Sequence, residues 1–533
     1  MKVIKRVLNI SFCFCILAGC LASCSQDEES VTNVSRTETE GINKDAILAF
    51  SSKDDIIQAV NGGESPTRAI ALNPTTGLTV ASPKILSLTD KVQANDPILN
   101  EVSEEEKQII LNEGMTYYDM FGCEDYIPSP NFAKLLNSNR EIQLNDSVYK
   151  ITEFGTLRAN QLNRKKLDLA YTKLKADTTI ALKNADFIPV VKGVELHPFK
   201  QVLVNRDDAP LLTRSVATDI PSNNFKHYTT KSKTVLGKIL GGIFGDRSVK
   251  HHEFMSKRRV NGSLYSYNYL VYYETGCFVS MSRKRRGFFK FINGWKDINA
   301  DELFMQYKGI VMELNLDVPQ GVLPSMPTNK KPEIASYSDM RIQGIDKVVH
   351  NTVDIFGYNV KEKDLYKFIG QGSKQIFSIL KGWLGNPNEL DKHYGANGQV
   401  PAVRILTPDK VYVIIADDTY NLPNVCKIRK VFNSGAKITL SYFWGASAWP
   451  TVLSSIKKTD KMPVKKLIGG EVLLAGKLSG KWGGMYISKN WRTRQTLWGA
   501  VQMLTQKHVA KRYIISQKVV PLHHETERQY KYV

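Results

Sequence analysis

Alternating aromatic residues mark the run Ser263-Leu-Tyr-Ser-Tyr-Asn-Tyr-Leu-Val-Tyr-Tyr-Glu274. Residues at every second position of a strand lie on one face of its sheet, and aromatic residues favour strands. The run therefore predicts a strand whose one face holds Tyr265, Tyr267, Tyr269, Val271 and Tyr273. Residues 411–416 and 436–444 are further strand candidates, so we expect the C-terminal three-fifths of the chain to be largely β.

The N-terminal part mixes helix and strand patterns. Residues 45–60 have the pattern of a strand followed by a short helix, and Ser103-Glu-Glu-Glu106 predicts a capped helix that runs through Met115. Residues 141–152 alternate on both sides of Asn145-Asp146, as in a β-hairpin. We therefore expect an α+β protein, in which a small α+β N-terminal module precedes a larger, mainly β, basic C-terminal region with a few amphipathic helices.

A polar stretch separates these two parts. Residues 205–224 contain prolines, an acidic pair and small polar residues, which favours an exposed linker, and we place the main domain boundary here. Residues 1–214 contain 24 basic and 28 acidic residues, whereas residues 215–533 contain 48 and 24, so the balance changes from −4 to +24. A basic region of this kind indicates an anionic partner: phosphorylated glycolipid, acidic polysaccharide or nucleic acid. A soluble basic protein without a particular target is the alternative.

The first residues have the pattern of a bacterial lipoprotein signal. Lys2, Lys5 and Arg6 precede a short apolar run, which is followed by Leu21-Ala-Ser-Cys24. This tetrapeptide resembles the lipobox, which implies a signal peptide at 1–23 and acylation of Cys24; the similar Cys20 lies before three more small or apolar residues. Residues 24–43 then form a flexible tether. A plain secretory signal with incidental cysteines is the alternative.

Signatures of enzymes and metal sites are weak. No CxxC pair occurs after the signal region, and His251-His-Glu253 and His523-His-Glu525 lack the spacing of a zinc protease. No GxSxG elbow or phosphate-binding glycine loop is present. We therefore predict no enzyme and name no catalytic, cofactor-binding or metal-binding residue, although folding alone decides whether distant side chains meet.

Two amphipathic runs favour membrane contact. In residues 234–246 apolar pairs recur every four positions, and in residues 365–384 lysines recur every seven while aromatic and aliphatic residues lie elsewhere. The alternative is that both runs pack on the protein's own core. The residues predicted to meet a membrane are Leu236, Ile239, Leu240, Ile243, Phe244, Trp383 and Leu384.

A basic cluster and two matching loops complete the set of candidates. Arg283, Lys284, Arg285 and Arg286 are predicted to contact anions; outside the cell, lipid phosphate is a better partner than nucleic acid. Alternatively, the cluster is a solvated turn.

Thr-Arg followed by a small residue occurs at Arg68 and at Arg214, each within a predicted exposed loop. Cleavage after both arginines would remove residues 44–68, leave 69–214 as a pro-region and free 215–533 as a basic effector. The alternative is a coincidence of common residues.

Residues 127–156 resemble a module of uncharacterised Bacteroidota surface lipoproteins. The whole arrangement resembles the protease-activated, surface-stored antibacterial protein toxins of Bacteroidales. That resemblance implies a surface-exposed lipoprotein of the outer membrane, an arginine-specific protease, and an anionic glycolipid or membrane of a target bacterium as partners. It also implies either release after cleavage or a two-chain toxin. The rival function is an unprocessed surface lipoprotein that binds glycan or host matrix through exposed Tyr and Trp residues of 263–296 and 441–499.

Overall fold

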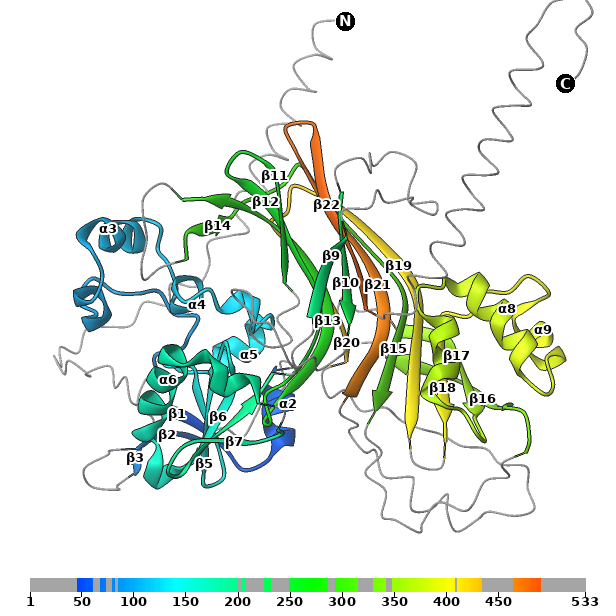
Figure 1. The fold of residues 1–533 in the computed structure, drawn as a ribbon, viewed down its shortest axis with the longest axis horizontal. Helices are drawn as coiled ribbons and strands as arrows, with labels where there is room; N and C mark the ends of the chain where they lie inside the picture. Colours follow the sequence, from blue (N-terminus) through cyan, green and yellow to red (C-terminus); the bar gives the residue numbers. More distant parts are fainter. Residues whose placement is uncertain are drawn as a thin grey trace, which may run out of the picture. The chain divides into compact units, whose positions relative to one another are not determined.

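The computed structural model describes residues 46–60, 68–72, 79–81, 85–183, 185–199, 203–207, 225–231, 249–285, 293–314, 329–341, 348–407, 410–433 and 464–489. All of these residues belong to one compact unit. Among the described residues strands outnumber helices, which confirms the α+β, mainly β fold class (Figure 1).

The N-terminal module, residues 46–199, is built on an eight-stranded sheet with the order β3-β2-β1-β4-β5-β6-β8-β7. Its strands are β1 (Ile47–Phe50), β2 (Arg68–Leu72), β3 (Thr79–Ala81), β4 (Glu141–Leu144), β5 (Ser147–Thr152), β6 (Gly155–Asn160), β7 (Ile188–Val191) and β8 (Val194–Pro198). Helix α6 (Lys166–Ala176) covers one face, because Leu167, Ala170 and Leu174 recur at helical spacing and are fully buried there. The other face packs on α2 (Lys53–Val60), α3 (Glu104–Asn112), α4 (Tyr117–Met120) and α5 (Pro130–Leu135).

Local sequence signals explain several of these elements. The predicted strand and helix of residues 45–60 are β1 and α2. The capping box is present: the Glu106 amide donates to Ser103 Oγ at 3.3 Å, and the Ser103 amide donates to the Glu106 carboxylate at 3.1 Å. The helix ends at Asn112 rather than Met115, where Gly114 adopts φ 57°. Asn145 at φ 52° forms the predicted turn between β4 and β5.

The C-terminal region contains two further sheets. The nine-stranded sheet has the order β16-β17-β18-β19-β15-β21-β22-β10-β9, and the five-stranded sheet has β11-β12-β13-β14 with β20 paired to β13. The nine strands are β9 (Leu203–Asp207), β10 (Phe225–Lys231), β15 (Glu302–Leu314), β16 (Glu333–Arg341), β17 (Val348–Phe356), β18 (Ala402–Leu406), β19 (Val411–Pro423), β21 (Val464–Leu478) and β22 (Lys481–Lys489). The five are β11 (Lys250–Met255), β12 (Arg258–Asn268), β13 (Tyr273–Lys284), β14 (Trp295–Asp297) and β20 (Lys427–Asn433).

These two sheets pack face to face around a shared apolar core. Tyr307 and Ile310 both point into this core, although strict alternation would place them on opposite faces. A bulge between them, where the register shifts, restores the pattern. Gly309 sits in the bulge at φ 50°, and a Cβ there would lie 2.1 Å from the Phe368 carbonyl oxygen, so only glycine fits.

Helices cover the other face of the nine-stranded sheet. They are α7 (Glu362–Leu365), the 3-10 turn Tyr366–Phe368, α8 (Ser373–Trp383) and α9 (Asn388–Tyr394). The apolar stripe of α8 is buried against the sheet, Leu384 is 3% exposed, and Trp383 packs partly buried against Phe368. This corrects the expectation that Trp383 and Leu384 meet a membrane, because the protein's own core already covers that face.

The aromatic run of residues 263–274 is a hairpin rather than one strand. Strand β12 ends at Asn268, β13 begins at Tyr273, and Asn268 pairs with Tyr273. The turn depends on Leu270, which adopts φ 69° and whose amide donates to the Asn268 side chain at 2.9 Å. An asparagine that accepts a bond from two residues onward is a recognised turn former, and it takes the place of the missing glycine or proline.

Several predicted features lie outside the described residues: Cys24, Arg214, Arg286, the strand 436–444, and the run 234–246 with Leu236, Ile239, Leu240, Ile243 and Phe244. The strand at 411–416 is confirmed as the first half of β19. Within the described ranges, no helix combines the length and the apolar character needed to cross a bilayer.

Candidate functional site

The most elaborate contact among the described residues is the junction, where the N-terminal module meets the β12–β13 hairpin. We call Asn268–Tyr273 the hairpin tip. Tyr265, Tyr267 and Tyr269 form a stacked row along β12 and into the tip, with ring centroids 5.5 and 5.8 Å apart. All three are at most 2% exposed. The row was predicted, but its burial beneath the N-terminal module removes these tyrosines from the glycan-binding surface of the rival function.

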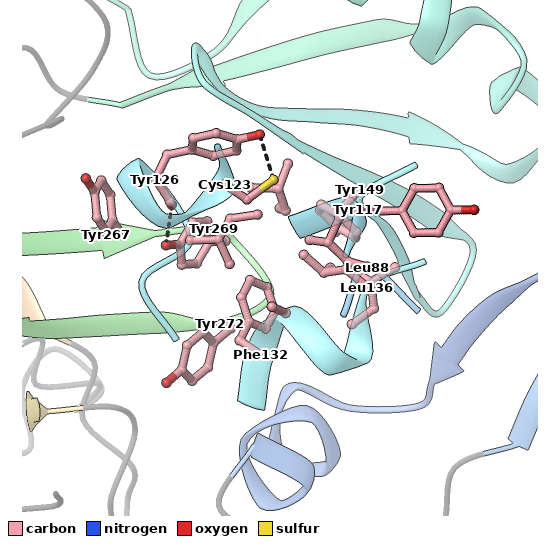
Figure 2. Packing of buried hydrophobic residues seen from close by; sticks show 14 of the residues in the cluster. Leu88, Tyr117, Cys123, Tyr126, Phe132, Leu136, Tyr149, Tyr267, Tyr269 and Tyr272 are labelled. Atoms are coloured by element: carbon pink, nitrogen blue, oxygen red, sulfur yellow. Dashed lines mark hydrogen bonds between the residues drawn. The ribbon is translucent and has the colours of Figure 1, made fainter. Parts of the chain in front are cut away.

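Aromatic residues of the N-terminal module enclose the row. The Phe132 ring lies 4.9 Å from that of Tyr269 and 4.7 Å from that of Tyr272 (Figure 2). Phe199, at the end of the module, lies 5.2 Å from Tyr267 and 5.8 Å from Tyr269. Buried aromatic pairs in tilted or edge-on arrangements stabilise a contact by about 0.5–1.5 kcal/mol beyond the burial of their area.

Two tyrosine hydroxyls of the hairpin donate to backbone carbonyls of the module. The Tyr267 hydroxyl donates to the carbonyl of Asp125 at 2.9 Å, and the Tyr269 hydroxyl to the carbonyl of Tyr126 at 2.7 Å. These carbonyls lie at the end of the 3-10 turn Cys123–Asp125, which Gly122 introduces at φ 61°. Each such bond contributes about 1 kcal/mol net, and losing it leaves a buried carbonyl without its partner.

Ion pairs join the two parts at the rim of the junction. The Lys427 amino group lies 2.6 Å from the Glu124 carboxylate. Glu113 accepts from Arg285 Nε at 2.9 Å and lies 3.5 Å from the amino group of Lys296. Arg285 also donates to the carbonyls of Asn293 and Trp295. Arg285, which was predicted to contact an anion, therefore already contacts one, and in this structure that anion is a carboxylate of the same chain.

A buried carboxylate lies directly beside the hairpin tip. Glu274 is 1% exposed and accepts from the Tyr272 hydroxyl at 2.7 Å and from Arg429 Nη2 at 2.7 Å. Burial, followed by the nearby Glu274 charge, raises the pKa of Tyr265 and of Tyr272 well above the usual range. Both tyrosines therefore remain neutral donors at physiological pH, and the carboxylate remains paired.

A cavity of about 370 Å³ opens beside the junction, lined from both sides. On the N-terminal side, the Arg140 guanidinium lies 4.8 Å from the Tyr171 ring centroid and 3.7 Å from the Glu153 carboxylate. On the sheet side, Arg259 lies 4.0 Å from the Trp295 ring centroid. The Arg259 Nε has no hydrogen-bond partner among the described residues, and burial lowers the pKa of Arg259 to about 10.

Asp297 is a carboxyl group that lines this cavity. Burial, and then the negative charge of Glu124, raise the pKa of Asp297 to about 7. Cys123 lies beneath the cavity wall, 3.2 Å from the Tyr126 hydroxyl, and burial raises the pKa of its thiol to about 11. The thiol is therefore protonated and poorly nucleophilic. The described residues include no group of three or more His, Cys, Asp or Glu able to hold a metal ion.

Arg68, the first of the two predicted cleavage sites, lies in a sheet. Arg68 is the first residue of β2 and pairs with Ala49 of β1, so the backbone after it is part of a sheet rather than a loop. Ile47 and Phe50 are buried, and β1 lies between β2 and β4. Residues 44–68 therefore contribute a strand and a helix to the module, and their removal would take out part of its core.

The proposed cut after Arg214 has a different consequence. Strand β9 precedes the linker and β10 follows it, and the two pair antiparallel from Leu203 to Asp207. A cut between them would leave β9 on the N-terminal fragment and in the sheet of the C-terminal fragment. Residues 215–533 would therefore be nicked, but not freed by the cut alone.

Arg283 and Lys284 lie away from the hairpin tip, exposed at the end of β13. No protein-family model matches the chain, and no curated protein or solved structure is detectably similar to it.

Proposed function

We propose that the protein is a surface-anchored antibacterial toxin held latent by its N-terminal module and activated by cleavage after Arg214. The basic C-terminal part then acts on the envelope membrane of a competing bacterium. The observation that carries this proposal is the junction: the module encloses the hairpin tip through aromatic contacts, two tyrosine hydrogen bonds and rim ion pairs. Such a contact is non-covalent and can open once the linker is cut.

The charge distribution along the chain also supports this proposal. Residues 1–214 carry a balance of −4 and residues 215–533 one of +24, so an anionic surface would attract the C-terminal part rather than the module. Acylation of Cys24 would hold the latent protein on the outer membrane of the producing cell, facing outward. Pairing between β9 and β10 supports a two-chain state after cleavage, rather than immediate release.

Vesicle leakage tests the proposal. The full chain, and the same chain after treatment with an arginine-specific protease, are added to dye-loaded vesicles of phosphatidylglycerol and phosphatidylcholine or of phosphatidylcholine alone. We expect leakage only from the anionic vesicles and only after cleavage. Arg214→Gln is the matched control, since it should resist the cut and stay inactive. Equal leakage by the intact chain, or none by the cleaved chain, contradicts the proposal.

A second candidate, an unprocessed glycan-binding protein, has one observation in its favour. The cavity beside the junction combines Trp295 and Tyr171 rings with amide and carboxylate groups, a mixture suited to a polar ligand. In that case a sugar should bind the intact chain, the Trp295→Ala variant should lose that binding, and vesicles should stay intact under all conditions.

A further inference from the structure

The end of the β12–β13 hairpin farthest from its tip carries a concentration of positive charge, which we call the basic corner. It consists of Lys257, Arg258, Arg283, Lys284, Arg285 and Lys296. Arg258 lies directly opposite Arg283 on the neighbouring strand, and Arg283 directly opposite Lys296. At about 3.3 Å per residue, the ten steps from Arg258 to Asn268 place this corner roughly 33 Å from the tip.

Cations directly opposite one another on neighbouring strands destabilise a sheet, so an anion bound between them would stabilise the arrangement. Lys257, Arg283 and Lys284 are exposed and Arg258 is half-buried. Within the described part of the chain, none of these four forms an ion pair.

The remaining two cations already hold an anion. The carboxylate of Glu113, the residue directly after α3, sits between Arg285 Nε at 2.9 Å and Lys296 Nζ at 3.5 Å. Arg285 is held in place because its other donors bind the carbonyls of Asn293 and Trp295, and its side chain is 7% exposed. The basic corner is therefore a preformed oxyanion site, and the N-terminal module supplies its present occupant.

We propose that the basic corner is the surface that binds lipid phosphate, and that Glu113 occupies it as an internal competitor while the module is in place. This rests on the proposed function, in which the target is an anionic membrane. When the junction opens, Glu113 leaves with the module, and the site grows from four uncompensated cations to six. A phosphate oxygen then takes the place of the carboxylate oxygen between Arg285 and Lys296.

Binding is tested separately from leakage by co-sedimentation of the uncleaved chain with vesicles. Each basic side chain near an anionic surface strengthens binding by about fivefold. Glu113→Gln keeps the shape of the side chain and removes its negative charge, which leaves the positive charges of Arg285 and Lys296 uncompensated. We expect this variant to bind phosphatidylglycerol vesicles up to about 30-fold more tightly than the parent, with no change on phosphatidylcholine.

The complementary variant removes two of the uncompensated cations. Arg258→Ala combined with Arg283→Ala should weaken binding of the cleaved protein to anionic vesicles by about 30-fold. Lys367→Ala combined with Lys374→Ala is the matched control: it removes the same charge from exposed positions on the helical cover and should change binding far less.

The outcomes separate the two proposals. If both double variants lose binding equally, charge alone matters and the basic corner is not the site. If Glu113→Gln binds like the parent, the internal competitor is refuted. If the cleaved protein causes leakage but the variant that lacks Arg258 and Arg283 binds anionic vesicles normally, this inference is refuted and the proposed function stands. If the cleaved protein neither binds vesicles nor causes leakage, both are refuted.

Discussion

Tyr269 offers the sharpest test of how the module is held on the hairpin. Its side chain is 1% exposed, its ring contacts Phe132 and Phe199, and its hydroxyl donates to the Tyr126 carbonyl. Truncating a buried aromatic residue to alanine costs about 3–5 kcal/mol, and at this position that cost falls on the contact with the module. Since each 1.4 kcal/mol is tenfold, Tyr269→Ala should weaken association of the two cleaved fragments by about 100-fold or more.

A conservative variant divides this effect into its parts. Tyr269→Phe keeps the ring contacts and removes only the hydrogen bond, so it should cost about 1 kcal/mol, or roughly fivefold in affinity. The assay follows separation of the fragments by analytical ultracentrifugation across a urea series, after cleavage at Arg214.

Tyr307→Ala is the control, because Tyr307 is 3% exposed in the core between the two sheets of the C-terminal region. It should lower the stability of that region without a matching loss of fragment affinity. Tyr269 does not hold the module on the hairpin if the Tyr269→Ala fragments separate at the same urea concentration as the parent, or if the Tyr307→Ala fragments separate as readily.

Three other perturbations follow from buried groups. Because the pKa of Asp297 is raised to about 7, its protonated form stabilises the fold at low pH, and that stability is lost as the pH rises from about 4 to 7. In thermal unfolding, the Asp297→Asn variant should therefore gain more stability at pH 8 than at pH 5. An equal gain at both pH values would contradict the raised pKa. Asp354 pairs with fully buried Arg404 at 2.6 Å, so Asp354→Ala should lower the free energy of unfolding by about 3–5 kcal/mol in urea, and a loss below 1 kcal/mol would argue against burial of the pair. Leu384→Ala should cost about 2–5 kcal/mol in stability with unchanged vesicle binding, whereas weaker binding at equal stability would restore the membrane role of that helix.

Local features of this fold were predictable from sequence. Ser103 and Glu106 form a capping box whose two bonds span three residues, and Asn145 favours the left-handed conformation of a short hairpin turn, so both signals lie within a few positions. The alternation of tyrosines in β12 was equally visible. In each case the physical cause acts between neighbours in the chain.

The parts that sequence reasoning missed depend on distant residues or on a weaker signal. The hydrogen bond between Arg285 and Glu113 joins residues 172 positions apart, so no local sequence pattern predicts this contact. The amphipathic pattern ending at Leu384 shows an apolar face but not which surface covers it. The turn at Leu270 was missed because an asparagine side chain takes the place of glycine there.

Native mass spectrometry of the protein after cleavage at Arg214 tests the central claim most directly. The account predicts that the two fragments remain a one-to-one complex in buffer, held by the junction and by the pairing of β9 with β10, and that they separate when anionic vesicles are added. Immediate separation of the fragments in buffer would contradict it, because the junction would then be too weak to hold the C-terminal part latent.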